Sequence, residues 1–279
     1  PPGACDTHAH LFGPTSRFPY QRERSYTPPD ATEDAYRHML RTLGFSRAVL
    51  VQPSVYGTDN RRMLETLSAR RPDDDIQWRG VAVVDRDVTD AELERLHAVG
   101  VRGIRMNLLF PGGIDFAAME QLGGRIADLG WHAQLFVDVS RFDRLAERVS
   151  RLRVDAVVDH MGYMATSKGL KDPGFQDLLA LLRDGRTWVK LSGPNRITAL
   201  DRSPYTDVDP FLTALLEARS DRCVFGTDWP HVQLSTPMPN DGSLVDEFLR
   251  LVTSPADRQA ILVDNPARLY GFRDTAVSR

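Results

Sequence analysis

The chain has 279 residues, of which 42% are hydrophobic and 26% are charged, and its formal net charge is −3 at pH 7. This is ordinary globular composition, and so small a net charge gives no electrostatic reason to expect a nucleic acid or an anionic membrane as partner. No stretch approaches the ~18 consecutive apolar residues of a membrane-spanning helix. Two cysteines, Cys5 and Cys223, are too few for a disulfide framework and predict a cytoplasmic protein. The sequence starts Pro-Pro-Gly without a methionine, so we expect that residues before Pro1 have been removed.

Short runs rich in β-branched residues recur along the chain and predict strands. They cover residues 4–10, 47–53, 78–84, 101–108, 132–137, 155–160, 187–192 and 223–228. Segments with helix signals lie between them. The segment "VTDAELERLHAVG" has Thr89 and Glu92 at the spacing of a capping box, and residues 173–185 and 207–220 repeat apolar residues every three or four positions.

Strands that alternate with helices over roughly 250 residues predict a (β/α)8 TIM barrel, with residues 1–279 as a single domain. A doubly wound open sheet is the alternative. That fold usually has fewer strands, and it carries a glycine-rich turn after its first strand that this sequence lacks. Active sites of TIM barrels lie at the C-terminal ends of the strands, so polar residues at the predicted strand ends are the candidates for function.

The first strand contains "CDTHAH", residues 5–10. Side chains of an extended segment alternate between its two faces, so Asp6, His8 and His10 are expected to share one face. His160 ends the sixth predicted strand and Asp228 ends the eighth. Polar groups of this kind are costly to bury unless they are used, so we predict a catalytic centre at the mouth of the barrel that contains His8, His10, His160 and Asp228.

Alternation along the other strands adds further polar side chains to this mouth. They are Gln52, Ser54, Arg105, Asn107, Lys190 and Ser192, with Arg196 and His231 just beyond the seventh and eighth strands. Lys190 is expected to pair with a neighbouring carboxylate inside the barrel. His38 and His97 lie in predicted helices and His132 lies at the opposite end of its strand, so these three are expected to be structural.

The assembled residues resemble the amidohydrolase superfamily, which has His-x-His on strand 1, a histidine on strand 6 and an aspartate on strand 8. Over nearly the whole chain the sequence is similar to the branch that contains 2-pyrone-4,6-dicarboxylate lactonase and sugar lactonases. The segments that carry this similarity are "ACDTHAHLFGP", "VQPSVYGTDNR", "GVRGIRMN", "VVDHMG", "VKLSGPNR", "GTDWPH" and "LVDNPARLYGF". The resemblance implies a hydrolase (lactonase) that acts on a small anionic lactone, in aromatic compound or sugar-acid catabolism.

Lactone hydrolysis requires deprotonation of a water molecule and polarisation of a carbonyl oxygen. The resemblance implies that Asp228 takes the proton, while His8, His10 and His160 either donate hydrogen bonds to the oxyanion or hold a metal ion. A binuclear metal site is not expected, because Arg105 occupies strand 4, where many amidohydrolases have a lysine. His8, His10, His160 and Asp228 have acceptable chemistry for one zinc ion. The pyrone dicarboxylate lactonases work without a divalent metal, so the resemblance implies that no metal is required.

The resemblance also implies a set of substrate-binding residues. They are Tyr26, Ser54, Arg105, Asn107, Arg196 and His231. Arginine holds a carboxylate through two parallel hydrogen bonds, which suits Arg105 and Arg196 to an anionic substrate. The sequence departs from the dicarboxylate pattern at Pro111, where another arginine is expected, and at Phe136, where a tyrosine is expected. We therefore predict a lactone with one strong anionic group, such as a muconolactone-like or sugar-acid lactone.

Other functions remain open at this stage. The same scaffold suits a lactone isomerase or a metal-dependent decarboxylase. A third possibility, from another functional class, is a barrel that binds a ligand without catalysing a reaction. Family habit implies a monomer or a homodimer.

Overall fold

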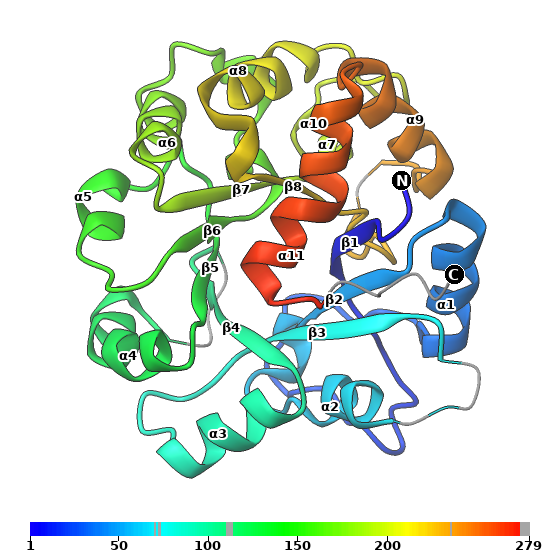
Figure 1. Ribbon diagram of the computed structural model, residues 1–279, viewed down its shortest axis with the longest axis vertical. Coiled ribbons are helices and arrows are strands. Elements are labelled where there is room, and N and C mark those ends of the chain that lie inside the picture. The colour runs from blue at the N-terminus through cyan, green and yellow to red at the C-terminus, as the bar shows by residue number, and fades with distance from the viewer. Residues whose placement is uncertain (70, 72–73, 110–113, 235, 274–279) are drawn as a thin grey trace.

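The structure, a computed structural model, describes residues 1–69, 71, 74–109, 114–234 and 236–273. Within them, eight parallel strands form one sheet in sequence order, which confirms the predicted (β/α)8 barrel (Figure 1). The strands are β1 Cys5–Ala9, β2 Arg47–Val51, β3 Gln77–Ala82, β4 Val101–Asn107, β5 His132–Phe136, β6 Ala156–Val158, β7 Thr187–Leu191 and β8 Cys223–Phe225.

Helices surround this ring of strands (Figure 1). They are α1 Glu33–Leu43, α2 Arg61–Ser68, α3 Asp90–Ala98, α4 Phe116–Asp128, α5 Leu145–Ser150, α6 Pro173–Asp184, α7 Pro194–Ile197, α8 Asp209–Arg219, α9 Asp241–Leu251, α10 Pro255–Gln259 and α11 Asn265–Tyr270. Shorter turns of helix lie at Ser54–Tyr56, His160–Gly162, Thr166–Lys168, Ser220–Arg222 and Ala260–Asp264. The Thr89 side chain caps α3 by accepting a hydrogen bond from the Glu92 amide at 3.2 Å, as the capping-box spacing predicts. Among the helices in these ranges, none has both the length and the apolar character to cross a bilayer.

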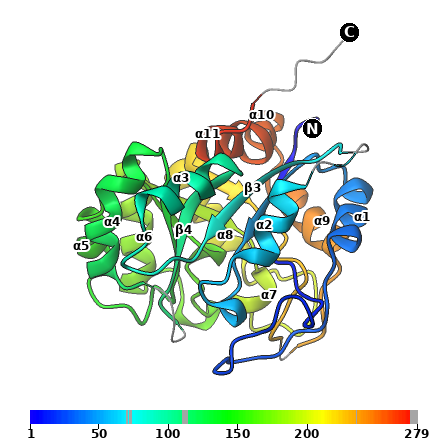
Figure 2. The same ribbon diagram turned by 90° about the horizontal axis from the view of Figure 1, so that it is seen from below.

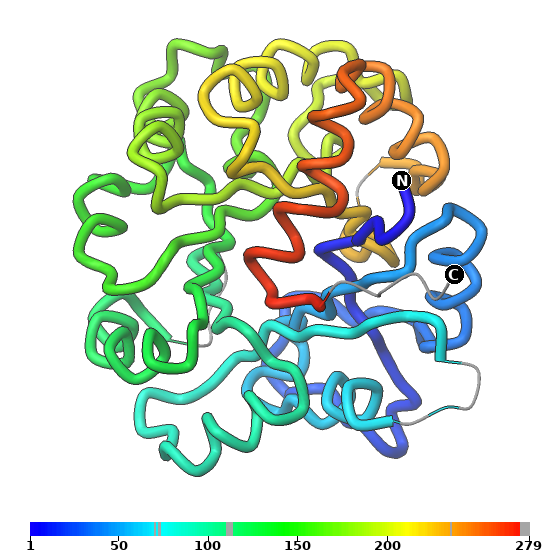
Figure 3. Tube along the Cα trace, viewed as in Figure 1, coloured from blue at the N-terminus to red at the C-terminus, as the bar shows by residue number. Residues whose placement is uncertain are grey.

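The chain runs once around the barrel and brings its first strand beside its last (Figure 3). Two backbone hydrogen bonds join them, from the Asp228 amide to the His8 carbonyl at 2.8 Å and from the His10 amide to the Trp229 carbonyl at 2.9 Å. Gly226 permits this approach, since a Cβ atom there would lie only 2.8 Å from the Cβ of His8. The seam between β1 and β8 therefore places His8, His10 and Asp228 next to one another.

The two ends of the barrel differ (Figure 2). At the N-terminal end, α11 packs Leu269 and Tyr270 against interior side chains of the strands, including Val49 and Val224. His132 is buried at this end, where its ring meets the edge of Tyr270 at 5.2 Å, in keeping with a structural role. At the opposite end lie α7 and the long loop that follows β1, and they surround the C-terminal ends of the strands.

One prediction about β1 is wrong. Asp6 does not share a face with the two histidines, because its carboxylate accepts hydrogen bonds from Tyr36 of α1 at 2.8 Å and from the Thr227 hydroxyl at 2.6 Å. The pairing of β1 with β2 shifts register between Asp6 and Ala9, which breaks the simple alternation of the strand. Asp6 consequently stabilises the contact between β1, α1 and the segment after β8, whereas His8 and His10 face the interior.

Candidate active site

A pocket opens at the C-terminal ends of the strands. Its lining includes His10, Tyr26, Ser54, Arg105, Asn107, Phe136, His160, Arg196, Asp228, Val232 and Gln233. Most of the residues predicted from the sequence are thus brought together here. His8 lies beneath them and is fully buried, and its Nε2 approaches the carboxylate of Asp228.

Three imidazoles surround one oxygen of Asp228. Its Oδ1 lies 3.8 Å from Nε2 of His8, 4.0 Å from Nε2 of His10 and 3.8 Å from Nε2 of His160. All four side chains are buried. These separations exceed a hydrogen bond, so none of these rings bonds Oδ1 directly, and a water molecule, a substrate atom or a metal ion beside them could contact both a nitrogen and the oxygen.

The backbone after β6 and β8 turns two of these side chains inward. Both strands end earlier than predicted, at Val158 and Phe225, and His160 and Asp228 lie just beyond them with φ angles of 50° and 69°. Residues other than glycine rarely adopt positive φ, and such conformations gather at functional sites. The β-branched pattern predicts the strands, whereas these left-handed turns depend on local backbone geometry.

The hydrogen bonds of the ring nitrogens determine what two of the histidines can do. Nδ1 of His10 lies 2.7 Å from the carbonyl oxygen of Val51, which only accepts, so Nδ1 carries the proton and Nε2 presents a lone pair. Nδ1 of His160 lies 2.9 Å from the hydroxyl of Ser192, which donates or accepts and leaves either tautomer open. Burial lowers the pKa of His10 to about 3 and that of His160 to about 4, so both rings are neutral at pH 7. His10 therefore accepts through Nε2, and of these two only His160 can donate to an oxyanion.

Asp228 is held as a carboxylate by its surroundings. Arg196 donates from Nε to Oδ2 of Asp228 and from Nη2 to the carbonyl oxygen of Val232 at 3.1 Å. Burial alone would raise the pKa of Asp228, but the Arg196 guanidinium and the neighbouring imidazoles lower it well below its usual value. Arg196, predicted to bind a substrate carboxylate, thus bonds the carboxylate of the protein itself.

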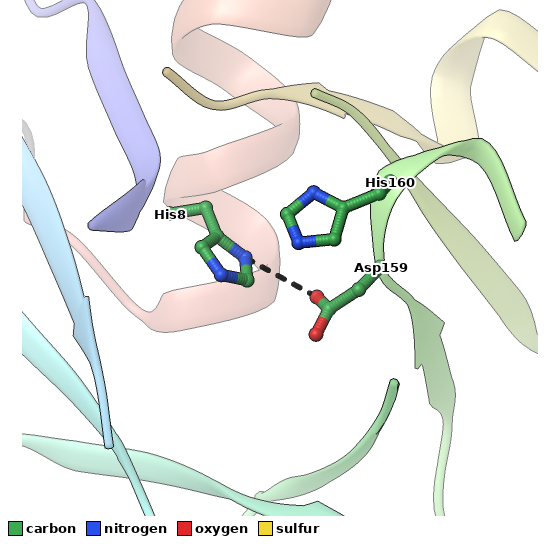
Figure 4. A group of neighbouring side chains, drawn as sticks. All are labelled: His8, Asp159 and His160. Carbon is green, nitrogen blue, oxygen red and sulfur yellow. Dashed lines mark ion pairs between the residues drawn. The ribbon is translucent and has the colours of Figure 1, made fainter. Parts of the chain in front are cut away.

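Asp159 is the second buried carboxylate of the site and was not predicted from the sequence (Figure 4). Its Oδ1 lies 3.3 Å from Nδ1 of His8, and its Oδ2 accepts hydrogen bonds from Nη2 of Arg105 at 3.3 Å and from Nε2 of Gln134 at 3.1 Å. Nζ of Lys190 lies 3.7 Å from Oδ1, so Asp159 is the carboxylate partner expected for this lysine. A signal was available, since Asp159 follows Val157 with the alternation of an inward-facing strand position.

Arg105 is positioned on three sides. Besides Asp159, it donates from Nη1 to the carbonyl oxygen of Gln52 at 3.4 Å, and its guanidinium lies 4.9 Å from the ring centre of Phe136. The side chain of Gln52, predicted at the mouth, instead donates to the carbonyl oxygens of Gly57 and Asp59. Arg105 is consequently held with its planar guanidinium group at the wall of the pocket.

His231 does not lie where its position after the eighth strand predicts. Its Nε2 lies 2.8 Å from Oδ1 of Asp241 at the start of α9, and it is not among the lining residues of the pocket. Its φ angle of 59° turns it away from the strand direction, which the sequence pattern did not reveal. Asn107 does line the pocket, and its side chain accepts a hydrogen bond from the Leu109 amide at 3.2 Å. Pro111 lies outside the described residues.

The donor set fits a single metal ion. His8, His10 and Asp228 offer ligand atoms close enough together to share one ion, and so do His8, Asp159 and His160. Among the described residues, Nε2 of His8 has no hydrogen-bond partner although it is fully buried. Imidazole nitrogens and a carboxylate are the usual ligands of zinc. A zinc ion on His8, His10 and Asp228 would act as a Lewis acid toward a carbonyl oxygen or a bound water.

Comparisons with known proteins agree on one family. The sequence pattern of the amidohydrolase family matches residues 5–272. The chain is 38% identical to 2-pyrone-4,6-dicarboxylate hydrolase of Comamonas testosteroni, over 97% of this chain and 90% of that protein. It is 36% identical to 4-sulfomuconolactone hydrolase of Hydrogenophaga intermedia, over 97% of this chain and 89% of that protein. A crystal structure of a probable 2-pyrone-4,6-dicarboxylic acid hydrolase from Acinetobacter baumannii, with citric acid bound, superposes with a TM-score of 0.85 and 29% identity, over 97% of this chain and all of that one.

Proposed function

This chain belongs to the amidohydrolase family, and from that premise we propose that it hydrolyses a small lactone that carries one strong anionic group. The observation that carries the proposal is the position of Asp228, ringed by three imidazoles in the same pocket as Arg105. The relatives lend support, since two are named as hydrolases of anionic lactones. A structural relative has citric acid bound, which is compatible with a carboxylate ligand for this family.

In the reaction that we propose, Arg105 binds the anionic group of the substrate and orients the ring. Asp228 takes a proton from a water molecule that also donates to the lone pair of His10, and the water oxygen attacks the lactone carbonyl carbon. Nε2–H of His160 donates to the oxyanion that forms. The bond to the ring oxygen then breaks, that oxygen receives the proton from Asp228, and the product is an open-chain hydroxy acid.

The preference for a substrate with one anionic group rests on the arginine side chains of the pocket and on how each is already bonded. Arg105 and Arg196 both line the cavity, but the hydrogen bonds of Arg105 to Asp159 and to the Gln52 carbonyl are long, at 3.3 and 3.4 Å, whereas Arg196 bonds Asp228 closely. The phenyl ring of Phe136 carries no hydrogen-bonding group. A second carboxylate on the substrate would have to compete with Asp228 for Arg196. Tyr26, Ser54 and Asn107 line the remaining wall and are proposed to bind the other polar atoms of the substrate.

The test is a panel of lactones assayed by proton release with a pH indicator. We expect turnover of muconolactone-like or sugar-acid lactones, and a kcat/KM at least about 10-fold lower for the methyl ester of the same lactone, because an ester cannot form a charged pair with Arg105. Solvent ¹⁸O should appear in the product, whereas a lactone isomerase would incorporate none. Absence of turnover across the panel would reject the hydrolase, and equal kcat/KM for the pyrone dicarboxylate and the monoanionic lactones would remove the preference for one anionic group.

We further propose that hydrolysis requires no metal ion. Oδ2 of Asp228 is bonded to the Arg196 guanidinium, and Arg105 adds a second positive charge to the same pocket, so a cation there meets repulsion from both. The enzyme purified without added metal is expected to keep its activity after dialysis against a chelator. Stoichiometric zinc in the purified protein, with activity lost on chelation and restored by zinc, would contradict this prediction.

A further inference from the structure

Nδ1 of His8 lies between two groups of opposite charge, and its partner decides what His8 can do. The distance is 3.3 Å to Oδ1 of Asp159 and 3.3 Å to Nζ of Lys190. If Asp159 is the partner, Nδ1 carries the proton and Nε2 faces Asp228 as a lone pair. If Lys190 donates to Nδ1, the proton of the neutral ring lies on Nε2 instead.

The remaining contacts of these two partners decide between the possibilities. Lys190 donates to the carbonyl oxygen of Thr7 at 2.7 Å and to Oε1 of Gln134 at 2.9 Å, and the third proton of its ammonium group is shared between Nδ1 of His8 at 3.3 Å and the negative Oδ1 of Asp159 at 3.7 Å. Oδ1 of Asp159 is buried and accepts no hydrogen bond from the described residues, because the 3.3 Å contact with Nδ1 of His8 has the distance of a hydrogen bond but not its alignment. Among the described residues, His8 and Lys190 are the possible proton donors near this oxygen. A buried carboxylate oxygen without a donor is destabilising, and a proton on Nδ1 of His8 supplies the closer donor.

We propose that Asp159 is a positioning residue that holds His8 as its Nδ1–H tautomer, so that Nε2 presents a lone pair to the space beside Asp228. The structural part of this inference stands alone, and its catalytic consequence rests on the proposed function. His10 has the same tautomer through Val51, so two imidazole lone pairs and one carboxylate oxygen converge on one space. A water molecule held there donates one hydrogen to Asp228 and the other to one of the two imidazoles, which leaves its oxygen lone pairs free for the lactone carbonyl.

The tautomer is directly measurable in the wild-type protein. Long-range ¹H–¹⁵N correlation spectra of ¹⁵N-histidine-labelled protein distinguish a protonated from an unprotonated ring nitrogen, and loss of one signal set in His8→Gln assigns His8. We expect Nδ1 of His8 to be protonated and Nε2 to be bare in wild type. A protonated Nε2 would overturn the proposal, and this measurement requires no variant of Asp159.

Asp159→Asn is expected to invert the tautomer. The position of Oδ2 receives donors from both Arg105 and Gln134, so the amide oxygen of asparagine stays there and its NH2 group faces Nδ1 of His8. Nδ1 must then accept, and the proton moves to Nε2. An unchanged His8 signal in a folded Asp159→Asn protein would overturn the proposed role of Asp159.

Activity gives a separate readout. By analogy with catalytic triads in which asparagine imposes the wrong tautomer, kcat of Asp159→Asn for the lactone should fall by roughly 10²–10⁴-fold, with a smaller change in KM. Asp155→Asn is the matched control, since Asp155 lies at the other end of β6 and bonds Trp188, and it should leave the His8 signal and kcat unchanged. Equal loss of kcat in both variants would reject the positioning role. If wild type hydrolyses no lactone, the proposed function fails, while the spectra still decide the tautomer.

Discussion

Asp228→Asn is expected to lower kcat for the lactone by roughly 10²–10⁴-fold, while the affinity for a carboxylate ligand such as citrate changes little. Asparagine has nearly the same shape, and its amide oxygen can still accept the hydrogen bond from Nε of Arg196. The amide nitrogen then faces the three imidazoles, where it can neither take a proton from water nor return one to the ring oxygen. Steady-state kinetics and calorimetric titration with citrate measure the two quantities separately.

Asp241→Asn provides the control for this experiment. Asp241 is also a carboxylate beside a buried histidine, since it bonds His231, but the described lining of the pocket includes neither residue. Its substitution should leave kcat within about twofold. A loss below tenfold in Asp228→Asn would exclude Asp228 as the base, and a large loss in Asp241→Asn would return His231 to the substrate-binding set.

The sequence predicted the barrel and the gathering of polar residues at its mouth, because both follow from periodic patterns. Eight runs of β-branched residues determine the strand count, and strand ends of a parallel barrel meet at one face whatever the side chains are. His10, His160, Arg105 and Asp228 line the pocket for this reason. Family resemblance, rather than periodicity, drew attention to Tyr26 in the long loop after β1.

The failures have a different origin, because each depends on backbone or side-chain detail that periodicity does not contain. Asp6 does not lie on the same face of β1 as His8 and His10, because the register between β1 and β2 shifts at that point. His231 lies outside the lining of the pocket because its φ angle is positive and its side chain bonds Asp241. Arg196 lies in the pocket as expected, but its bond to Asp228 depends on a side-chain conformation that sequence alone leaves open.

Arg105→Lys is expected to lower kcat/KM for an anionic lactone by roughly 10–100-fold, although the charge is retained. The guanidinium offers a planar fork for a carboxylate and stacks on Phe136, whereas a lysine ammonium is a point charge that does neither as well. Hydrogen bonds to charged groups contribute about 1.5–3 kcal/mol each, which corresponds to this range. Arg102→Lys is the control on the same strand, because Arg102 bonds backbone carbonyls of His97 and Val101 away from the pocket.

A second effect of the same substitution must be separated from the first. Arg105 also donates to Asp159, so its loss can disturb His8 as well as the substrate. Measurement of the lactone and its methyl ester with wild type and Arg105→Lys resolves this, because disturbance of His8 lowers kcat/KM for both substrates by the same factor. Loss of the carboxylate contact lowers it for the anion alone. We expect the anion to lose at least about tenfold more than the ester, and equal losses would mean that Arg105 acts through Asp159 and does not bind the anionic group.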